Sequence, residues 1–146
     1  MSRFAVTRST AMALVALAFL ASPVAAMDAG KPEKAWQAVI TGQIEAFRTR
    51  DGSAALGFAG RDFQMQFRNP DAFVATVEAM GYDPLVRSRS HSFGDFTQVD
   101  DTHVVQLVRI VGPDQLIYEA LYQLEQEPGG WRVEGVALKR EAGVAI

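Results

Sequence analysis

Residues 103–140 decide the fold, and they read 103-HVVQLVRIVGPDQLIYEALYQLEQEPGGWRVEGVALKR-140. The side chains of this stretch fall into two faces with the two-residue period of a β-strand, and over 115–126 one face is more polar than the other. Two groups of turn-forming residues interrupt the alternation, Gly112-Pro113-Asp114 and Pro128-Gly129-Gly130. Short turns between successive strands predict an antiparallel meander, with strands over about 103–112, 115–126 and 131–140.

A fourth strand is expected just upstream, over about 86–99, joined to the next strand by Asp100-Asp101. The strand at 103–112 is apolar on both faces, which favours a central strand that is covered on both sides. In the last strand the apolar phase changes at Gly135, which predicts a β-bulge there.

Helical patterns fill the chain before these strands. Over about 33–48, apolar residues recur at helical spacing and form one stripe, which also includes Gln43: Trp36, Val39, Ile40, Ile44 and Phe47. Gly42 lies inside this helix, and its small size would let a neighbouring element approach closely. Asp51 is a good N-cap for a short second helix that ends at Gly60.

A further helix starts at Asn69-Pro70-Asp71, with Asn as the cap and Pro in the first turn, and it ends at Gly81. The alternating pattern over 61–68 is too short to assign to a helix or a strand. Helices followed by a meander predict an α+β fold, in which N-terminal helices pack on one face of a curved four-stranded antiparallel sheet.

The first 26 residues have the features of a secretory signal peptide. Arg3 and Arg8 form a positive segment, about ten apolar residues follow, and small residues precede a cut expected after Ala26. The apolar segment is about half of the roughly 20 residues that a membrane span needs. We therefore expect residues 27–146 to form a single soluble domain, with a core over about 33–140, that is periplasmic or secreted and has no membrane span after cleavage.

Composition excludes several classes of function. Without the leader the chain has 12 basic and 17 acidic residues, a net charge of −5 with His neutral, which argues against nucleic-acid binding. The sequence has no cysteine, which excludes disulfides, thiolate metal sites and a lipid-modified cysteine. The two histidines, His91 and His103, have no partner at helical spacing, so a metal site would need carboxylates from distant parts of the chain. The sequence predicts neither a metal site nor a cofactor.

Several motifs resemble known families. The segments 43-QIEAFR-48, Asp51 with 54-AAL-56, 120-ALY-122 and 130-GWRV-133 resemble the nuclear-transport-factor-two-like (cystatin-like) superfamily. More narrowly, 67-FRNPDAF-73, 87-RSRS-90 and 105-VQLV-108 resemble small exported bacterial proteins catalogued as domain of unknown function 4864. The resemblance covers about 36–140. It implies a cone-shaped α+β fold with a cavity between helices and sheet, but no particular reaction, because the superfamily includes isomerases, dehydratases, cyclases and pure binding modules.

Three side chains on the sheet are candidates for binding a ligand in such a cavity: Gln106, Tyr118 and Tyr122. Gln106 lies between Val104 and Val108, so its amide either forms a structural hydrogen bond or orients a ligand. The tyrosines are either core residues with the hydroxyl at the rim or ligand contacts. No acidic residue shares their predicted face, so the sequence assigns no catalytic residue.

These observations favour a non-catalytic module that binds a small apolar or amphipathic molecule or another protein. The first alternative is an enzyme of the isomerase or dehydratase type that uses an acid–base group in the cavity. The second alternative is a purely structural homodimer with the sheet face as its interface, which the apolar residues on both faces of strand 103–112 suggest.

Overall fold

Five short α-helices precede four β-strands in the computed structural model, which describes residues 34–142. The helical elements are α1 (Ala35–Arg48), α2 (Gly52–Phe58), α3 (Arg61–Gln66), α4 (Pro70–Val77), the wider turn η1 (Glu78–Tyr82) and α5 (Asp83–Val86). The strands are β1 (Ser90–Gln98), β2 (His103–Val111), β3 (Ile117–Glu127) and β4 (Gly130–Arg140). The signal peptide predicted over 1–26 lies outside the described residues.

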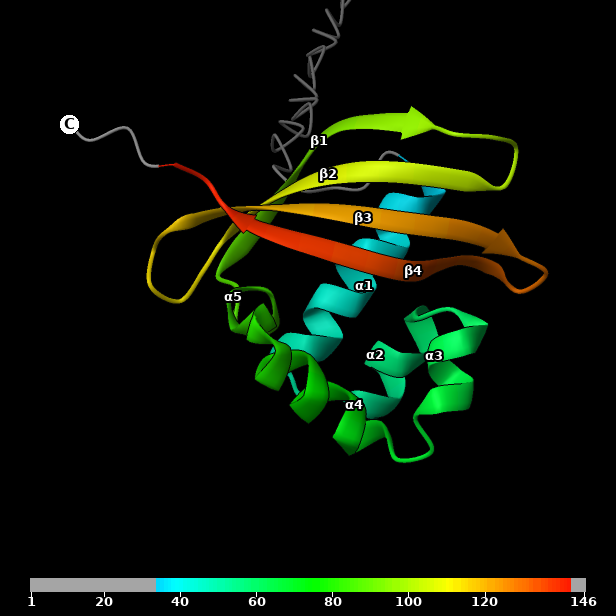
Figure 1. The fold of residues 1–146 in the computed structure, drawn as a ribbon, viewed down its shortest axis with the longest axis horizontal. Coiled ribbons are helices and arrows are strands. Elements are labelled where there is room, and N and C mark those ends of the chain that lie inside the picture. Colours follow the sequence, from blue (N-terminus) through cyan, green and yellow to red (C-terminus); the bar gives the residue numbers. More distant parts are fainter. Residues whose placement is uncertain (1–33, 143–146) are drawn as a thin grey trace, which may run out of the picture.

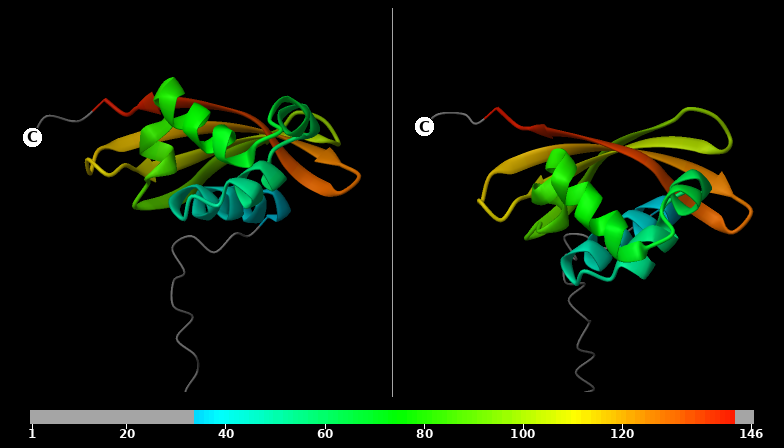
Figure 2. Two further views of the ribbon diagram at one scale, coloured as in Figure 1. Left: turned by 90° about the horizontal axis from the view of Figure 1, so that it is seen from below. Right: turned by 60° about the horizontal axis from the view of Figure 1, so that its bottom comes forward.

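The four strands form one antiparallel sheet in the order β1-β2-β3-β4, which is the predicted meander. The helices lie against one face of this sheet, with α1 crossing beneath the strands (Figures 1 and 2). We call the face toward the helices the inner face and the opposite one the outer face. The predicted α+β fold is therefore confirmed.

The core lies between the inner face and α1. Ile40 and Ile44 of α1 are fully buried, and so are the inner side chains of the two central strands: Val104, Gln106, Val108, Ile110, Ala120, Tyr122 and Leu124. Each large apolar side chain removed from water in this way stabilises the fold by about 1.5–3 kcal/mol before the entropy of ordering it is counted. The alternation read from the sequence places these residues on one face correctly.

Two expectations about local structure were wrong in detail, and one segment that the sequence left open has a structure. The strand expected from residue 86 begins at Ser90, because Asp83-Pro84 starts the short helix α5 and Pro fits the first turn of a helix. Residues left unassigned over 61–68 form α3. The bulge predicted at Gly135 is present one residue earlier, since Gly135 pairs with Gln123 and Val133 with Leu124, which leaves Glu134 as the extra residue.

The expectation that β2 is covered on both sides was also wrong. Within residues 34–142, all helices lie on the inner face, and no element packs over the outer one (Figure 2). Val105, Leu107 and Val111 on the outer face of β2 are accordingly half-buried, while the inner side chains are buried. Flanking side chains of the sheet shield these residues only in part.

Two glycines have the roles that the sequence suggests. At Gly42, a Cβ atom would lie 2.5 Å from the ring of Phe58, so the missing side chain allows α2 to pack closely on α1. Gly81 has φ +94°, a backbone conformation that disfavours other residues, and it ends the α4–η1 helical segment before α5 begins. None of the helices in the described part of the chain is long and apolar enough to cross a membrane.

Candidate functional site

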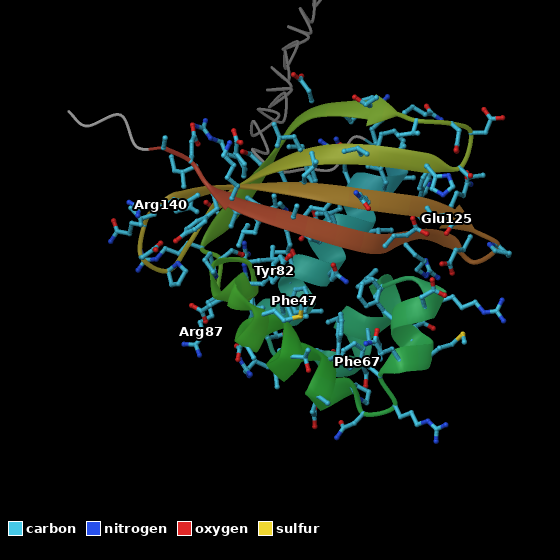
Figure 3. All side chains as sticks on the ribbon, viewed as in Figure 1. Phe47, Phe67, Tyr82, Arg87, Glu125 and Arg140 are labelled. Atoms are coloured by element: carbon cyan, nitrogen blue, oxygen red, sulfur yellow. The ribbon has the colours of Figure 1, made fainter. Side chains whose placement is uncertain are left out.

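A cavity of about 200 Å³ lies between α1, the α4–η1 segment and β4. Most of its lining is apolar: Gln43, Phe47, Ala59, Phe63, Phe73, Val77, Met80, Tyr82, Leu85, Val133, Gly135 and Val136. Phe47 and Tyr82 can be located in Figure 3, where both lie below β4 and toward α4 and α5. The cavity therefore lies between helices and sheet, where the family resemblance implies one.

The free edge of β4 forms one wall of the cavity. This edge would expose unpaired carbonyls, since β4 pairs with β3 on its other side only. The Tyr82 hydroxyl donates to the Val136 carbonyl at 2.7 Å, and the Gly60 N–H donates to the Val133 carbonyl at 2.8 Å. These hydrogen bonds attach the helical layer to the strand edge and hold the cavity wall in place.

Gln43 and Tyr82 are the hydrogen-bonding side chains of the lining. Gln43 is 2% exposed, and its Nε2 donates to the Ala55 carbonyl at 3.1 Å. Its Oε1 has no hydrogen-bond partner among the side chains and backbone groups of residues 34–142. Because the Tyr82 hydroxyl already donates its proton to Val136, the cavity offers two acceptors, the Gln43 carbonyl and the Tyr82 oxygen.

No carboxylate, lysine, arginine or histidine belongs to the described lining of this cavity. A charged ligand group inside it would lose its water without gaining a counter-ion, which is costly. The lining can therefore hold an apolar body together with a neutral hydrogen-bond donor.

Gln106 does not line this cavity, and its amide is fully engaged elsewhere. Its Oε1 accepts from Trp36 Nε1 at 2.9 Å and from Gln37 Nε2 at 3.0 Å, and its Nε2 donates to the Gly94 carbonyl at 2.9 Å. Nε2 also lies 2.9 Å from the carbonyl oxygen of Leu107. Both ends of the Gln106 amide thus have hydrogen-bond partners within the protein, as its structural role requires. A contact between Gln106 and a ligand remains a prediction.

The two candidate tyrosines differ in environment, and neither lines the cavity. Tyr118 is half-buried, and its hydroxyl donates to Asp114 Oδ2 at 2.8 Å, which raises the pKa of the phenol. Tyr122 is fully buried, and its hydroxyl has no partner among the described residues. Burial raises the pKa of Tyr122 far above the ordinary range, so this hydroxyl stays neutral.

Sequence reasoning did not select Gln43 and Tyr82 as site residues. Gln43 is the one amide among the apolar residues of the α1 stripe, and this feature of the sequence could have marked it as a site residue. Tyr82 follows Gly81, and only the reversal of the chain at that glycine turns its side chain toward β4. The strand-based selection of Gln106, Tyr118 and Tyr122 took the sheet centre as the site, whereas the cavity lies at the β4 edge.

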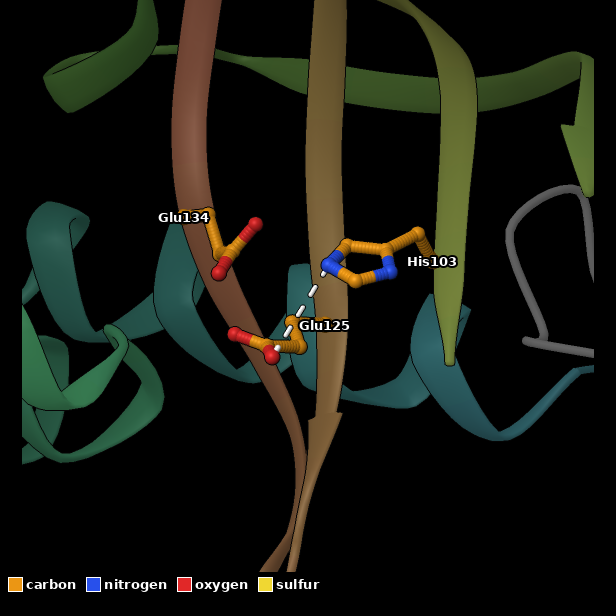
Figure 4. A group of neighbouring side chains, drawn as sticks. All are labelled: His103, Glu125 and Glu134. Atoms are coloured by element: carbon orange, nitrogen blue, oxygen red, sulfur yellow. Dashed lines mark ion pairs between the residues drawn. The ribbon is translucent and has the colours of Figure 1, made fainter. Parts of the chain in front are cut away.

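A second group of polar side chains lies on the outer face, from three neighbouring strands. His103 on β2, Glu125 on β3 and Glu134 on β4 each present one metal-ligating atom, and these atoms lie within 4.8 Å of one another. Figure 4 shows the three side chains in front of the strands, with the helices behind. A hydrogen bond shared with the Glu125 carboxylate, partial burial and the like charge of Glu125 raise the pKa of Glu134 to about 7.

Comparisons with known proteins identify the family and the fold. A family model described as "Domain of unknown function (DUF4864)" matches residues 30–146. A cystatin-like domain of unknown function from Nostoc punctiforme is similar in structure, with TM-score 0.50 and 17% identity over 73% of this chain and 75% of that one. An NTF-2 like protein of unknown function from Silicibacter pomeroyi has TM-score 0.51 and 13% identity over 73% of this chain and 93% of that one. No curated protein matches the chain.

Proposed function

The chain belongs to the family described as Domain of unknown function (DUF4864), and we propose that this member binds a small, neutral, largely apolar molecule in the cavity between α1, η1 and β4. The observation that carries the proposal is the lining itself. Phenylalanine, valine, leucine and methionine side chains surround a space of about 200 Å³ beside a buried amide with an unused acceptor. Such a combination of apolar walls and few polar groups is typical of ligand sites.

The volume indicates the size of the molecule. Drug-sized ligands occupy pockets of about 300–1,000 Å³, while a dry engineered cavity of about 150 Å³ binds benzene. A cavity of about 200 Å³ therefore suits one ring with a short substituent, or a short aliphatic chain. Met80 lies at this cavity and is 68% exposed, so its flexible side chain can adjust to different ligand shapes.

The polar groups indicate the chemical class. Gln43 Oε1 and the Tyr82 oxygen accept hydrogen bonds, so the favoured ligand carries a hydroxyl or an N–H group. A carboxylate would meet two acceptors and no cation, which disfavours fatty acids and other anions. Phenols and short alcohols are the simplest molecules of the favoured class.

The same lining supports binding over catalysis. An isomerase or dehydratase needs a group that takes a proton near neutral pH, most often a histidine or a carboxylate. The lining described here offers an amide and a phenol instead. The enzyme alternative would need an acid or base outside this cavity lining, and we therefore propose a binding module.

A titration followed by heteronuclear NMR tests the proposal with three probe ligands that share a ring. We expect p-cresol to bind more tightly than toluene, because only p-cresol can donate to Gln43 or Tyr82, and both to bind more tightly than 4-methylbenzoate. Val77→Phe places a larger side chain in the cavity and should abolish binding of p-cresol. Val99→Phe is the matched control, since Val99 is 62% exposed and not part of the lining.

Two results would overturn the proposal. One is equal binding of p-cresol by the Val77→Phe and Val99→Phe variants, which would place the ligand elsewhere. The other is the absence of shift changes with both p-cresol and toluene at millimolar concentration in the folded protein.

The place of action is also a proposal. The leader features of residues 1–26 support export to the periplasm or the medium, with cleavage after Ala26. Mass spectrometry of the chain produced with its leader in a Gram-negative host tests this. A mature protein that begins at Met27 in the periplasmic fraction supports export, and an uncut chain in the cytoplasm contradicts it.

The homodimer alternative has one specific observation in its favour. Ile117 and Leu121 on the outer face of β3 are 38% and 41% exposed, opposite half-buried Val111 and Leu107 on β2. A second copy of the chain could cover this apolar strip. Light scattering at micromolar concentration on the wild type and on Leu121→Glu tests this alternative. A wild-type dimer that becomes a monomer in Leu121→Glu supports the homodimer, whereas a monomer in both proteins contradicts it.

A further inference from the structure

We propose that His103, Glu125 and Glu134 form a binding site for one divalent transition-metal cation on the outer face of the sheet. This site is separate from the apolar cavity, and Figure 4 shows its side chains on the side of the strands facing the viewer, with α1 behind them. At the edge of β4 the start of α3 comes close, and Arg61 and Asp62 border the same open space as Glu125 and Glu134. The sequence predicts no metal site, because it shows no ligand pair at helical spacing. The sheet itself assembles the ligands, one from each of three adjacent strands.

The strand register explains why these three residues meet. His103 pairs directly with Glu125 across β2 and β3, and side chains of paired residues share one face. Glu134 is the extra residue of the β4 bulge, two residues after Arg132, which pairs with Glu125. Because Val133 faces the core, the alternation of side chains along β4 turns Glu134 to the opposite face, which also holds Glu125.

The separations suit a metal ion after a small closure. His103 Nε2 lies 3.8 Å from Glu125 Oε1, and all three ligand atoms lie within 4.8 Å of one another. Two ligand atoms bound tetrahedrally to zinc at about 2.1 Å each are about 3.4 Å apart. Rotation of the exposed Glu134 side chain can close the difference without moving the backbone.

His103 already has the orientation that a metal ligand needs. Its Nδ1 lies 2.9 Å and 3.0 Å from the two oxygens of Asp100, which places the ring proton on Nδ1. In the neutral ring Nε2 is then the unprotonated nitrogen, and it points toward Glu125. In zinc sites a carboxylate usually accepts a hydrogen bond from the nitrogen of the histidine that does not bind the metal. This hydrogen bond fixes the tautomer and makes the metal-binding nitrogen more basic.

Arg61 borders the same open space as the two carboxylates, and Arg132 pairs with Glu125 along the strands, but neither forms an ion pair with them. No lysine or arginine within residues 34–142 forms an ion pair with Glu125 or Glu134. Open space of about 280 Å³ adjoins them, bordered also by Glu127 and Asp62, and waters there can complete the coordination. A bound cation would relieve the repulsion between the facing carboxylates.

The donor set indicates which cations fit. One imidazole nitrogen and two carboxylate oxygens suit zinc, manganese, cobalt or nickel, whereas calcium and magnesium prefer oxygen ligands only. Because one ligand is exposed, two are half-buried and three protein ligands leave a position for water, the site resembles an open metal site and not a closed structural one.

Isothermal titration of the untagged full chain with Zn²⁺ tests the site, with Ca²⁺ as the comparison ion. We expect one Zn²⁺ per chain, and at least about tenfold weaker binding in His103→Gln and in Glu134→Gln. Asp100→Asn should weaken Zn²⁺ binding by about tenfold, as loss of an outer-layer carboxylate does in known sites. Glu119→Gln is the matched control on the same face and should bind Zn²⁺ like the wild type.

The proposal is overturned if the wild-type chain binds no Zn²⁺ at 100 μM, or if His103→Gln and Glu134→Gln bind it within threefold of the wild type. Thermal unfolding of each metal-free variant shows whether it is folded, so a loss of binding through unfolding is recognised. The apolar cavity plays no part in this test, and Val77→Phe should bind Zn²⁺ normally.

Discussion

The hydroxyl of Tyr82 donates a 2.7 Å hydrogen bond to the carbonyl of Val136, and both residues line the same apolar cavity. This bond joins the end of the α4–η1 segment to the open edge of β4. It satisfies a strand-edge carbonyl and leaves the phenol oxygen as an acceptor toward the cavity. The edge of the sheet is thus protected by the same residue that gives the cavity part of its polarity.

Tyr82→Phe should lower the free energy of unfolding by about 1 kcal/mol, since it removes a hydrogen bond to a partly buried carbonyl. Urea unfolding measures this loss. Tyr118→Phe is the matched control, because its hydroxyl bonds to exposed Asp114 and its loss should cost less. A larger cost at Tyr118 than at Tyr82 would contradict the role given to the strand-edge bond.

Tyr122→Phe should leave the free energy of unfolding unchanged or raise it. The Tyr122 hydroxyl is fully buried and has no partner among residues 34–142, so the tyrosine carries a desolvation cost of about 1–3 kcal/mol without compensation. Urea unfolding of this variant beside Tyr82→Phe gives the comparison. A clear destabilisation at Tyr122 would contradict this and would mean that a buried water or another bound molecule satisfies the hydroxyl.

Gln106→Leu should lower the free energy of unfolding by about 3 kcal/mol or more. The change leaves the Trp36 indole N–H and the Gly94 carbonyl without their buried partner, and each such group costs about 1–3 kcal/mol. Gln123→Leu on the exposed outer face is the control. If Gln106→Leu were as stable as the wild type but no longer bound p-cresol, Gln106 would be a ligand contact and not a structural one.

His91 should make the protein less stable as the pH falls below about 6.5. Burial, together with the nearby Arg48 guanidinium, lowers the pKa of His91 in the folded chain, and only Glu45 opposes this. The unfolded chain then binds a proton on His91 at a higher pH than the folded chain does. The stabilising contribution is present above pH 6.5 and is lost as the pH falls toward the folded pKa.

Urea unfolding at pH 7.5 and 5.5 measures the effect of His91, with His91→Gln as the comparison. The wild type should lose more stability than His91→Gln over this interval. His91 Nε2 lies 3.0 Å from the Thr41 hydroxyl, which glutamine can still reach. An equal loss in both proteins would mean that His91 does not couple folding to protons.

Much of the fold could be predicted, because its signals are local. Turn residues at 112–114 and 128–130 separate strands whose apolar alternation sets the inner face, and Asn69 and Asp51 cap helices as their side chains predict. The start of β1 was misjudged, because Leu85 and Val86 are apolar in either a strand or a short helix. Periodicity alone does not separate these cases over four residues.

The site was harder to predict, because it depends on packing between distant elements. Gln43 and Val136 belong to the first helix and the last strand, and only the assembled fold brings them to one cavity. His103 and Glu125 face each other through the β2–β3 register, and Glu134 joins them through a bulge placed one residue from the expected position. Without the strand register, the sequence alone does not indicate that these three residues lie close together.

Intermolecular NOE measurement with p-cresol on the isotope-labelled protein tests the central claim most directly, because it locates the ligand. The cavity account predicts NOEs from the cresol ring to the methyl groups of Val77, Leu85 and Val136. NOEs that instead involve only Ile117 and Leu121 on the outer face would contradict it, and so would a bound ligand without NOEs to any of the three cavity residues.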